Sequence, residues 1–210
     1  MNNAMKEHWN KVYSSNDTTK LGWYEETPAP SIKLLSKCNI SKDAAILDVG
    51  AGAATLTDYL VNNNYTNITV ADISEQALEK LKARLGKEKS ALVKWIVDDL
   101  TEPQHISQLR DVALWHDRAV LHFLLEESWQ QTYFSTLKKV VKKDGYVIIA
   151  AFSIGGAKKC CGLDVVNYDR NMLSEKLGGD FELIEAFDYI YRMPSGNTRP
   201  YIYTLFKRKC

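Results

Sequence analysis

The junction between an apolar run and a glycine-rich turn near residue 50 constrains the fold of this chain most. Residues 45–49 read Ala-Ile-Leu-Asp-Val, and Gly50-Ala51-Gly52 follows directly. A short apolar run bounded by turn residues predicts a buried strand. Because glycine has no Cβ, Gly50 and Gly52 allow a sharp turn and a close approach of the backbone to a ligand. Residues 53–63 then predict a helix whose free N-terminal amides face the same place.

Strand and helix patterns alternate from this junction to residue 152. We expect strands at 45–49, 68–71, 92–97, 112–115 and 146–152. Helices are expected at 53–63, 75–85 and 128–141. In the last of these helices, Ser128 and Gln131 resemble a capping box. Such alternation predicts an α/β fold with a doubly wound, mostly parallel sheet and helices on both of its faces.

The two ends of the chain depart from this alternation. After an expected helix at 170–177, residues 181–192 and 201–207 predict two strands joined by a short turn. A connection of that length joins antiparallel neighbours, so the sheet should end in an antiparallel hairpin. Ahead of the sheet, Pro28 near the start of an expected helix at 31–35 indicates an N-terminal helical arm.

Two acids near the glycine turn restrict the kind of ligand. Asp48 precedes the first glycine, where it would repel a pyrophosphate, and Thr55 replaces the third small residue of a dinucleotide fingerprint. Asp72 lies about 20 residues beyond the turn, where an acid can accept hydrogen bonds from ribose hydroxyls. These features disfavour a nicotinamide-dependent oxidoreductase. They favour a positively charged, ribose-bearing ligand without phosphates, a description that fits S-adenosylmethionine.

Composition limits the number of domains and the classes of partner. The chain has 210 residues, 45% of them hydrophobic, which is enough for one domain with a full core. Its 27 basic and 26 acidic residues form no basic stripe, so no nucleic-acid partner is expected. No apolar run is long enough for a membrane span. The four cysteines, at 38, 160, 161 and 210, show neither metal spacing nor a disulfide framework, so we expect no metal and a cytoplasmic location.

Several motifs occur in order along the chain: Leu-Asp-Val-Gly-Ala-Gly at 47–52, Ala-Asp-Ile-Ser at 71–74, Asp-Asp-Leu-Thr at 98–101 and the segment 115–124. With them, nearly the whole chain resembles the class I S-adenosylmethionine-dependent methyltransferases, which have a Rossmann-like, seven-stranded fold. It is most similar to a bacterial branch that carries Gly-Trp-Tyr-Glu, here at 22–25, and Cys-Gly-Leu, here at 161–163. The resemblance implies a single domain with an arm or lid (1–42), a cofactor-binding core (43–152) and an acceptor-side loop with the terminal hairpin (153–210).

The resemblance also implies which residues bind the cofactor. Asp48 helps hold the methionine ammonium, and Asp72 accepts both ribose hydroxyls. An acid in the doublet at 98–99 accepts the adenine amino group; Asp99 is the first choice, and Asp98 is the alternative. The expected cofactor-binding set is Asp48, Gly50, Ala51, Gly52, Asp72, Ile73, Asp98, Asp99, Leu100, Trp115 and His116.

Candidates for catalysis follow the fourth expected strand. His122 is the first candidate base, since the ordinary pKa of histidine is near neutrality. Its apolar neighbours Ala119, Val120, Leu121 and Phe123 slightly favour a packing role instead. Asp117 and Arg118 pair with each other or with the N-terminal arm, or the guanidinium clamps a carboxylate substrate.

Four aromatic residues of the arm are candidate lid residues. Trp9 and Tyr13 are spaced i and i+4, which favours packing of one helical face. Trp23 and Tyr24 are adjacent and cannot share such a face, so they fit a lid role better. In the loop after the fifth strand, Cys160 and Cys161 are best explained as small loop residues, although a soft acceptor such as a thiol or metalloid stays open.

We therefore expect a methyltransferase that acts on a small polar or anionic metabolite. Two alternatives remain. A protein lysine methyltransferase would have an open acidic rim, and a regulatory protein would bind S-adenosylmethionine without turnover.

Overall fold

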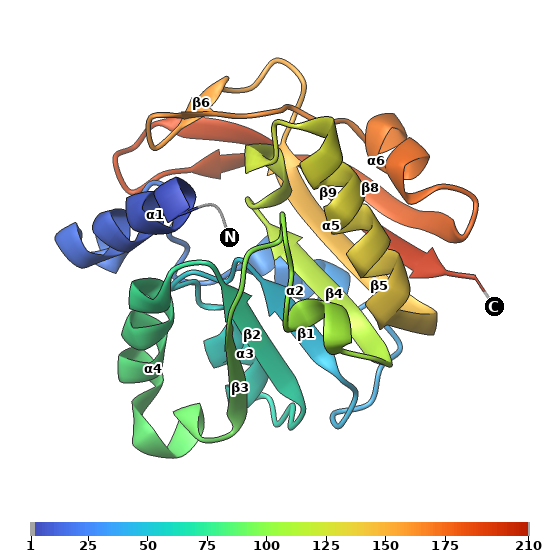
Figure 1. Ribbon diagram of the computed structural model, residues 1–210, viewed down its shortest axis with the longest axis horizontal. Helices are drawn as coiled ribbons and strands as arrows, with labels where there is room; N and C mark the ends of the chain where they lie inside the picture. Colours follow the sequence, from blue (N-terminus) through green and yellow to red (C-terminus); the bar gives the residue numbers. More distant parts are fainter. Residues whose placement is uncertain (1–2, 210) are drawn as a thin grey trace.

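A computed structural model describes residues 3–209 (Figure 1). Seven strands form one sheet in the order β3-β2-β1-β4-β5-β9-β8, and β6 pairs with β7 in a separate small hairpin. The strands are β1 (Ile46–Val49), β2 (Ile68–Asp72), β3 (Val93–Val97), β4 (Val112–Arg118), β5 (Val141–Phe152), β6 (Lys159–Cys160), β7 (Leu163–Asp164), β8 (Phe181–Arg192) and β9 (Thr198–Arg208). The α-helices are α1 (Asn3–Ser15), α2 (Ala29–Leu35), α3 (Leu56–Asn62), α4 (Glu75–Ser90), α5 (Glu127–Val140) and α6 (Arg170–Leu177). Short 3-10 turns are η1 (Thr18–Lys20), η2 (Ile106–Gln108) and η3 (Leu121–Phe123).

The sheet confirms the predicted topology. Strands β1 to β5 pair in parallel, while β9 runs antiparallel to both β5 and β8. The order reverses between β1 and β4, and ligands in doubly wound sheets bind beyond the carboxyl ends of the strands at such a point. The glycine turn follows β1 at this point.

Side chains of the central strands alternate between two hydrophobic cores. Ile46 packs with residues of α2, α3 and α4, whereas its neighbour Leu47 packs with residues of α5 and α6. In a strand, successive side chains point to opposite faces, so helices cover the sheet on both sides. Helix α1 lies against α4 beyond the sheet (Figure 1).

Several element boundaries differ from the sequence prediction. Helix α3 begins at Leu56 rather than at residue 53, because Arg84 binds the carbonyls of Ala53 and Ala54 and keeps both residues in the turn. The capping box at Ser128 is wrong: α5 begins at Glu127 after Glu126, and no side chain caps it. Helix α4 continues past residue 85 to Ser90 through a kink at Gly86.

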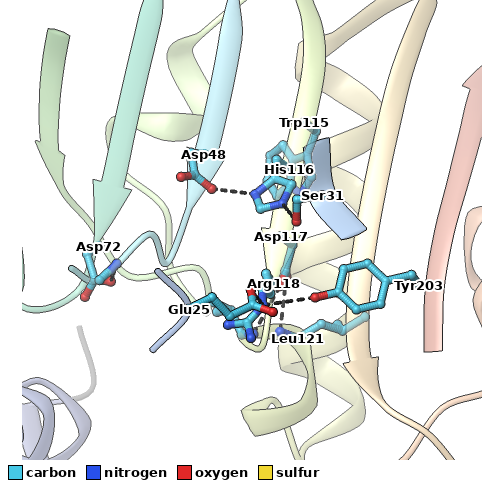
Figure 2. A network of polar contacts seen from close by, with 12 residues as sticks. Glu25, Ser31, Asp48, Asp72, Trp115, His116, Asp117, Arg118, Leu121 and Tyr203 are labelled. Carbon is cyan, nitrogen blue, oxygen red and sulfur yellow. Dashed lines mark hydrogen bonds and ion pairs between the residues drawn. The ribbon is translucent and has the colours of Figure 1, made fainter. Parts of the chain in front are cut away.

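Strand β4 is longer than predicted, and its length decides where the candidate residues point. It continues from Val112 through Arg118, so residues 116–118 belong to the strand. Trp115 and Asp117 face α5, where each contacts the hydroxyl of Tyr133. His116 and Arg118 point to the opposite face, toward residues 3–35, which we call the N-terminal segment (Figure 2).

Candidate functional site

The glycine turn after β1 lies at the base of a pocket. Gly50 and Gly52 both have φ of +56°, a left-handed conformation that side chains rarely adopt. A Cβ on Gly50 would lie 2.0 Å from Cγ2 of Val120, and one on Gly52 would lie 2.1 Å from the Tyr13 hydroxyl oxygen. Both positions therefore require glycine for conformation and for space.

Asp72 at the end of β2 is fixed by the same turn. One carboxylate oxygen accepts the Gly52 amide at 2.7 Å, and the other accepts the Ser74 amide at 2.7 Å. Burial raises the pKa of Asp72 to about 6, and these two amides oppose that rise. Each carboxylate oxygen has a further lone pair, so Asp72 can still accept hydrogen bonds from a ligand in the pocket that it lines.

Asp48, His116 and Ser31 form a buried chain of hydrogen bonds (Figure 2). Nδ1 of His116 lies 2.6 Å from Oδ1 of Asp48, and Nε2 lies 2.9 Å from the Ser31 hydroxyl. The second oxygen of Asp48 is buried and has no hydrogen-bond partner among residues 3–209. An anionic oxygen left unpaired in such a place is costly unless a cation or donor binds there.

The two acids after β3 have different surroundings. Asp98 accepts the backbone amides of Asp99, Gln104, His105 and Ile106 at 2.8–3.1 Å, which occupies the acceptor sites of its carboxylate. Asp99 accepts the amide and the hydroxyl of Thr101. Asp98 is thus used to shape the loop, which favours Asp99 as the acid that faces a ligand.

Aromatic residues of the N-terminal segment cover the pocket. Trp9 packs edge-to-face on Trp23 and on Phe123, with ring centroids 5.7 and 5.0 Å apart. The Trp23 indole nitrogen donates to the Tyr13 hydroxyl at 3.2 Å. Trp9, Tyr13 and Trp23 all line the pocket. Tyr24, a predicted lid residue, is absent from that lining within the described chain; its carbonyl accepts a hydrogen bond from the Tyr191 hydroxyl.

Arg118 ties this segment to β4. Its Nε lies 2.9 Å from Glu25 and 3.0 Å from the Tyr203 hydroxyl (Figure 2). One terminal nitrogen donates to the carbonyl of Trp23. The Arg118 and Glu25 side chains are only 7% and 8% exposed. Burial raises the pKa of Glu25, and Arg118 opposes the rise. The sequence left the Arg118 partner open, and the structure selects the N-terminal segment.

The structure places three expected site residues away from the pocket. Trp115 and Asp117 face α5, and Asp117 accepts the amides of Val120 and Leu121 as well as the Tyr133 hydroxyl. His122 is fully buried between the rings of Phe123 and Phe152, and burial lowers its pKa to about 3. These contacts give Asp117 a structural role at the end of β4, and they favour the packing interpretation of His122 over a catalytic one.

Most of the expected cofactor set does line the pocket. Within the described residues, the lining includes Asp48, Gly50, Ala51, Asp72, Ile73, Asp98, Asp99, Leu100 and His116, but neither Gly52 nor Trp115. Gly52 contributes its amide to Asp72 instead.

Sequence reasoning missed several lining residues. Ser31 and Glu25 line the pocket, as do Arg199 and Tyr201 of β9. Glu25 belongs to the Gly-Trp-Tyr-Glu stretch, which was a usable signal. Nothing in the sequence pattern marked Arg199, because its position depends on how β9 lies against β5. In residues 3–209, no three His, Cys, Asp or Glu side chains are grouped so that they could hold a metal ion.

The central part of the chain has a recognisable family signature. Residues 46–145 match the family model described as a methyltransferase domain. This segment spans β1 to the start of β5 and contains the glycine turn and both acids. Of the helices in residues 3–209, none is long and apolar enough to cross a membrane.

Curated proteins that are similar to this chain in sequence are named as methyltransferases. A zebrafish (Danio rerio) protein named EEF1A lysine methyltransferase 2 is 27% identical over 157 residues, which cover 70% of this chain and 67% of the relative. The human protein of the same name is 24% identical over 195 residues, which cover 86% and 75% of the two chains.

Solved structures share the fold over nearly the full length. A SAM-dependent methyltransferase from Anabaena variabilis superposes with a TM-score of 0.78 at 17% identity, covering 99% of this chain and 94% of the other. The 1,6-didemethyltoxoflavin-N1-methyltransferase of Burkholderia thailandensis, solved with S-adenosylhomocysteine, gives a TM-score of 0.67 at 16% identity, covering 99% and 85%. The chain has the Rossmann-like fold of these enzymes.

Proposed function

We propose that this protein is an S-adenosylmethionine-dependent methyltransferase. One observation carries the proposal: Asp48 and Asp72 line one pocket on either side of a glycine turn, and Asp48 keeps a buried oxygen unpaired among the described residues. That oxygen would repel a pyrophosphate and attract an ammonium group. The match of residues 46–145 to a methyltransferase domain supports the same conclusion.

The proposal assigns a role to each residue of the pocket. Asp48 binds the methionine ammonium, Asp72 accepts the ribose hydroxyls, and Asp99 with Leu100 and Ile73 holds the adenine. S-adenosylmethionine, when bound, supplies a methyl group on a sulfonium that is already a good leaving group. The protein then has to align the acceptor and exclude water. The rings of Trp9 and Trp23 serve water exclusion, and they also offer π faces to a sulfonium cation.

We propose a small anionic metabolite as the methyl acceptor. Arg118 and Arg199 both line the pocket, and one terminal nitrogen of Arg118 is buried without a hydrogen-bond partner in the described chain. We call the part of the pocket next to Arg118 and Arg199 the acceptor end. Glu25 neutralises one of these two guanidinium groups, so the acceptor end keeps one positive charge. Guanidinium groups suit carboxylates and other planar anions. The aromatic cover of the pocket favours a molecule small enough to be enclosed.

A protein lysine is the second candidate. The zebrafish and human relatives are named lysine methyltransferases, at 27% and 24% identity. Against this candidate, a lysine ammonium would have to approach the positive charge that Glu25 leaves uncompensated on the two arginines.

Calorimetric titration tests the cofactor. We expect micromolar binding of S-adenosylmethionine and no measurable binding of NAD. Binding of NAD alone would refute the proposal. A protein that binds S-adenosylmethionine but gives no turnover in any extract would instead fit the regulatory alternative.

Transfer of a labelled methyl group tests the acceptor. Cell extract is separated into a deproteinised small-molecule fraction and a protein fraction, and each is incubated with the enzyme and labelled donor. We expect label in anionic small molecules. Label found only in methyl-lysine of the protein fraction would establish the second candidate. As a check on the anion site, Arg199→Gln should raise KM for the acceptor and leave the affinity for S-adenosylmethionine unchanged.

A further inference from the structure

The tip of the β6–β7 hairpin has an uncommon residue for its backbone conformation. Cys160 pairs with Leu163, so Cys161 and Gly162 form a two-residue loop. Their φ angles are +50° and +81°, as a type I′ turn requires. Asn, Asp and Gly are the usual residues at such positions, and another residue with positive φ is uncommon. A conformation of this kind often marks a functional site.

The loop brings two thiols to the covered pocket. Cys160 and Cys161 both line it, and their side chains lie within hydrogen-bonding reach of each other. Arg199 and Tyr13 are the charged and aromatic neighbours of Cys161. The hydrogen bond from Cys160 lowers the pKa of Cys161, with a further contribution from Arg199, and Cys160 correspondingly keeps its proton. The pair therefore presents a nucleophilic sulfur beside a proton donor.

The surroundings of this pair restrict its chemistry. Zinc usually needs four ligands, and no set of three His, Cys, Asp or Glu side chains suited to a metal occurs among residues 3–209. Two adjacent sulfurs instead suit a soft centre that forms two bonds to thiolates and keeps its other substituent. We propose that Cys160 and Cys161 form a dithiol site for a trivalent arsenical at the acceptor end of the pocket.

The reaction of the site is a condensation without a change in oxidation state. With phenylarsine oxide as the probe, the Cys161 thiolate attacks arsenic and the Cys160 proton moves to the oxygen. The second sulfur then displaces that oxygen. Two As–S bonds form and the As–O bonds break; the oxygen leaves as one water molecule, with one proton from the Cys160 thiol and one from solvent that replaces the proton already lost by Cys161. This reaction is independent of methyl transfer, so its test does not depend on the proposed enzyme activity.

Intact-mass measurement of the reduced full chain tests the proposal. After incubation with phenylarsine oxide and washing with excess 2-mercaptoethanol, we expect one phenylarsenic group per chain. The dithiol 2,3-dimercaptopropanol should remove it. Retention of the group after the monothiol wash should fall at least tenfold in Cys160→Ser and in Cys161→Ser. Cys161→Asn is a second loss variant; since asparagine tolerates the left-handed conformation, it should fold as well as the wild type.

Two further variants control for the other cysteines. Cys38 is buried, and burial raises the pKa of its thiol to about 12, so Cys38→Ser should retain the adduct. Cys210 lies outside the described residues, and Cys210→Ser should retain the adduct as well. A wild-type chain that loses the group to 2-mercaptoethanol would overturn the proposal, as would full retention in folded Cys161→Asn.

Discussion

His116 joins Asp48 of β1 to Ser31 of α2 through its two ring nitrogens, at 2.6 and 2.9 Å. All three residues are at most 3% exposed. Because a carboxylate only accepts hydrogen bonds, Nδ1 of His116 carries a proton. The imidazole thus fixes one oxygen of Asp48 and leaves the other directed to the pocket. The carboxylate that we propose as the ammonium ligand is held in place by a helix of the N-terminal segment.

The first prediction concerns the charge of Asp48. Asp48→Asn keeps the size of the side chain but removes the negative charge that binds the methionine ammonium. A charge-assisted hydrogen bond contributes about 1.5–3 kcal/mol, so the affinity for S-adenosylmethionine should fall about ten- to hundredfold. Titration calorimetry measures this change directly.

Ser31→Ala is the matched control for Asp48→Asn. It removes the far end of the same hydrogen-bond chain and leaves the carboxylate in place. We expect a stability loss of about 1 kcal/mol and nearly unchanged affinity. If Asp48→Asn binds S-adenosylmethionine as tightly as the wild type, the assigned role of Asp48 is wrong.

The second prediction concerns pH and Asp72. Burial raises the pKa of this carboxyl to about 6. Below that pH the group becomes protonated and loses acceptor capacity for ribose hydroxyls. From pH 7 to pH 5, the affinity for S-adenosylmethionine should fall about tenfold, since roughly a tenth of the carboxyl stays ionised one unit below its pKa. Calorimetry over this range measures the effect, and in Asp72→Asn binding should be weak and free of this dependence.

The effect of Asp72 on the stability of the free protein has the opposite pH dependence: affinity rises with pH, whereas the free energy of unfolding falls. The pKa in the folded chain, about 6, exceeds the value of about 3.9 expected when unfolded. The unfolded chain therefore ionises first as pH rises, and the free energy of unfolding decreases between about pH 4 and pH 6. Thermal melts of the wild type and of Asp72→Asn, compared across this pH range, separate the contribution of Asp72 from the contributions of the other acidic residues. Equal pH dependence in both proteins would contradict it.

The sequence predicted the sheet well because its information is local. Short apolar runs, the paired glycines and the distance between Asp48 and Asp72 all lie within single strand–turn–helix units. The short terminal turn likewise predicted the antiparallel hairpin of β8 and β9. The pocket residues identified in this way, such as Asp48 and Asp72, lie at the carboxyl ends of strands. The local pattern of strand and turn is enough to fix their positions.

The acceptor end could not be predicted in the same way. His122 and Arg118 are close in sequence, but only the length of β4 determines that Arg118 faces the pocket. Arg199 comes from β9, and its approach to Cys161 depends on the packing of a hairpin against β5. Glu25 and Ser31 reach the site through a loop and a short helix. These are long-range contacts, and local periodicity contains no information about them.

A third prediction separates the two interpretations of His122. The ring is fully buried between Phe123 and Phe152, and burial lowers its pKa to about 3. His122→Ala should lower stability by about 2–4 kcal/mol through the cavity that it creates. Turnover per folded molecule should stay close to that of the wild type. Chemical denaturation and initial rates on the acceptor found in the extract screen measure these two effects.

His122→Leu is the informative companion to that variant. It fills most of the same space and cannot transfer a proton. We expect folding close to normal and an unchanged kcat, with no inflection from His122 in the rate profile between pH 5 and pH 8. A folded His122→Leu protein that binds S-adenosylmethionine normally but has lost turnover would re-establish His122 as a base.

The fourth prediction concerns the ion pair between Glu25 and Arg118. Both side chains are buried, so Glu25→Gln leaves the guanidinium without its counter-charge. Loss of one partner of a buried pair costs about 3–5 kcal/mol. The cost should appear where the pair acts, as weaker docking of the N-terminal segment on β4. Hydrogen exchange in residues 3–35 should accelerate, and dissociation of S-adenosylmethionine should become faster as the aromatic cover loosens.

Glu79→Gln provides the control for this ion pair. Glu79 pairs with Lys82 on the surface of α4 at 2.7 Å, with its side chain 56% exposed, and exposed pairs of this kind contribute less than about 1 kcal/mol. Both variants change one carboxylate to an amide, so they share any effect of net charge. Accelerated exchange in residues 3–35 that is specific to Glu25→Gln would establish Arg118 as the anchor of the cover. Equal exchange in the two variants would show that the aromatic contacts alone hold the segment over the pocket.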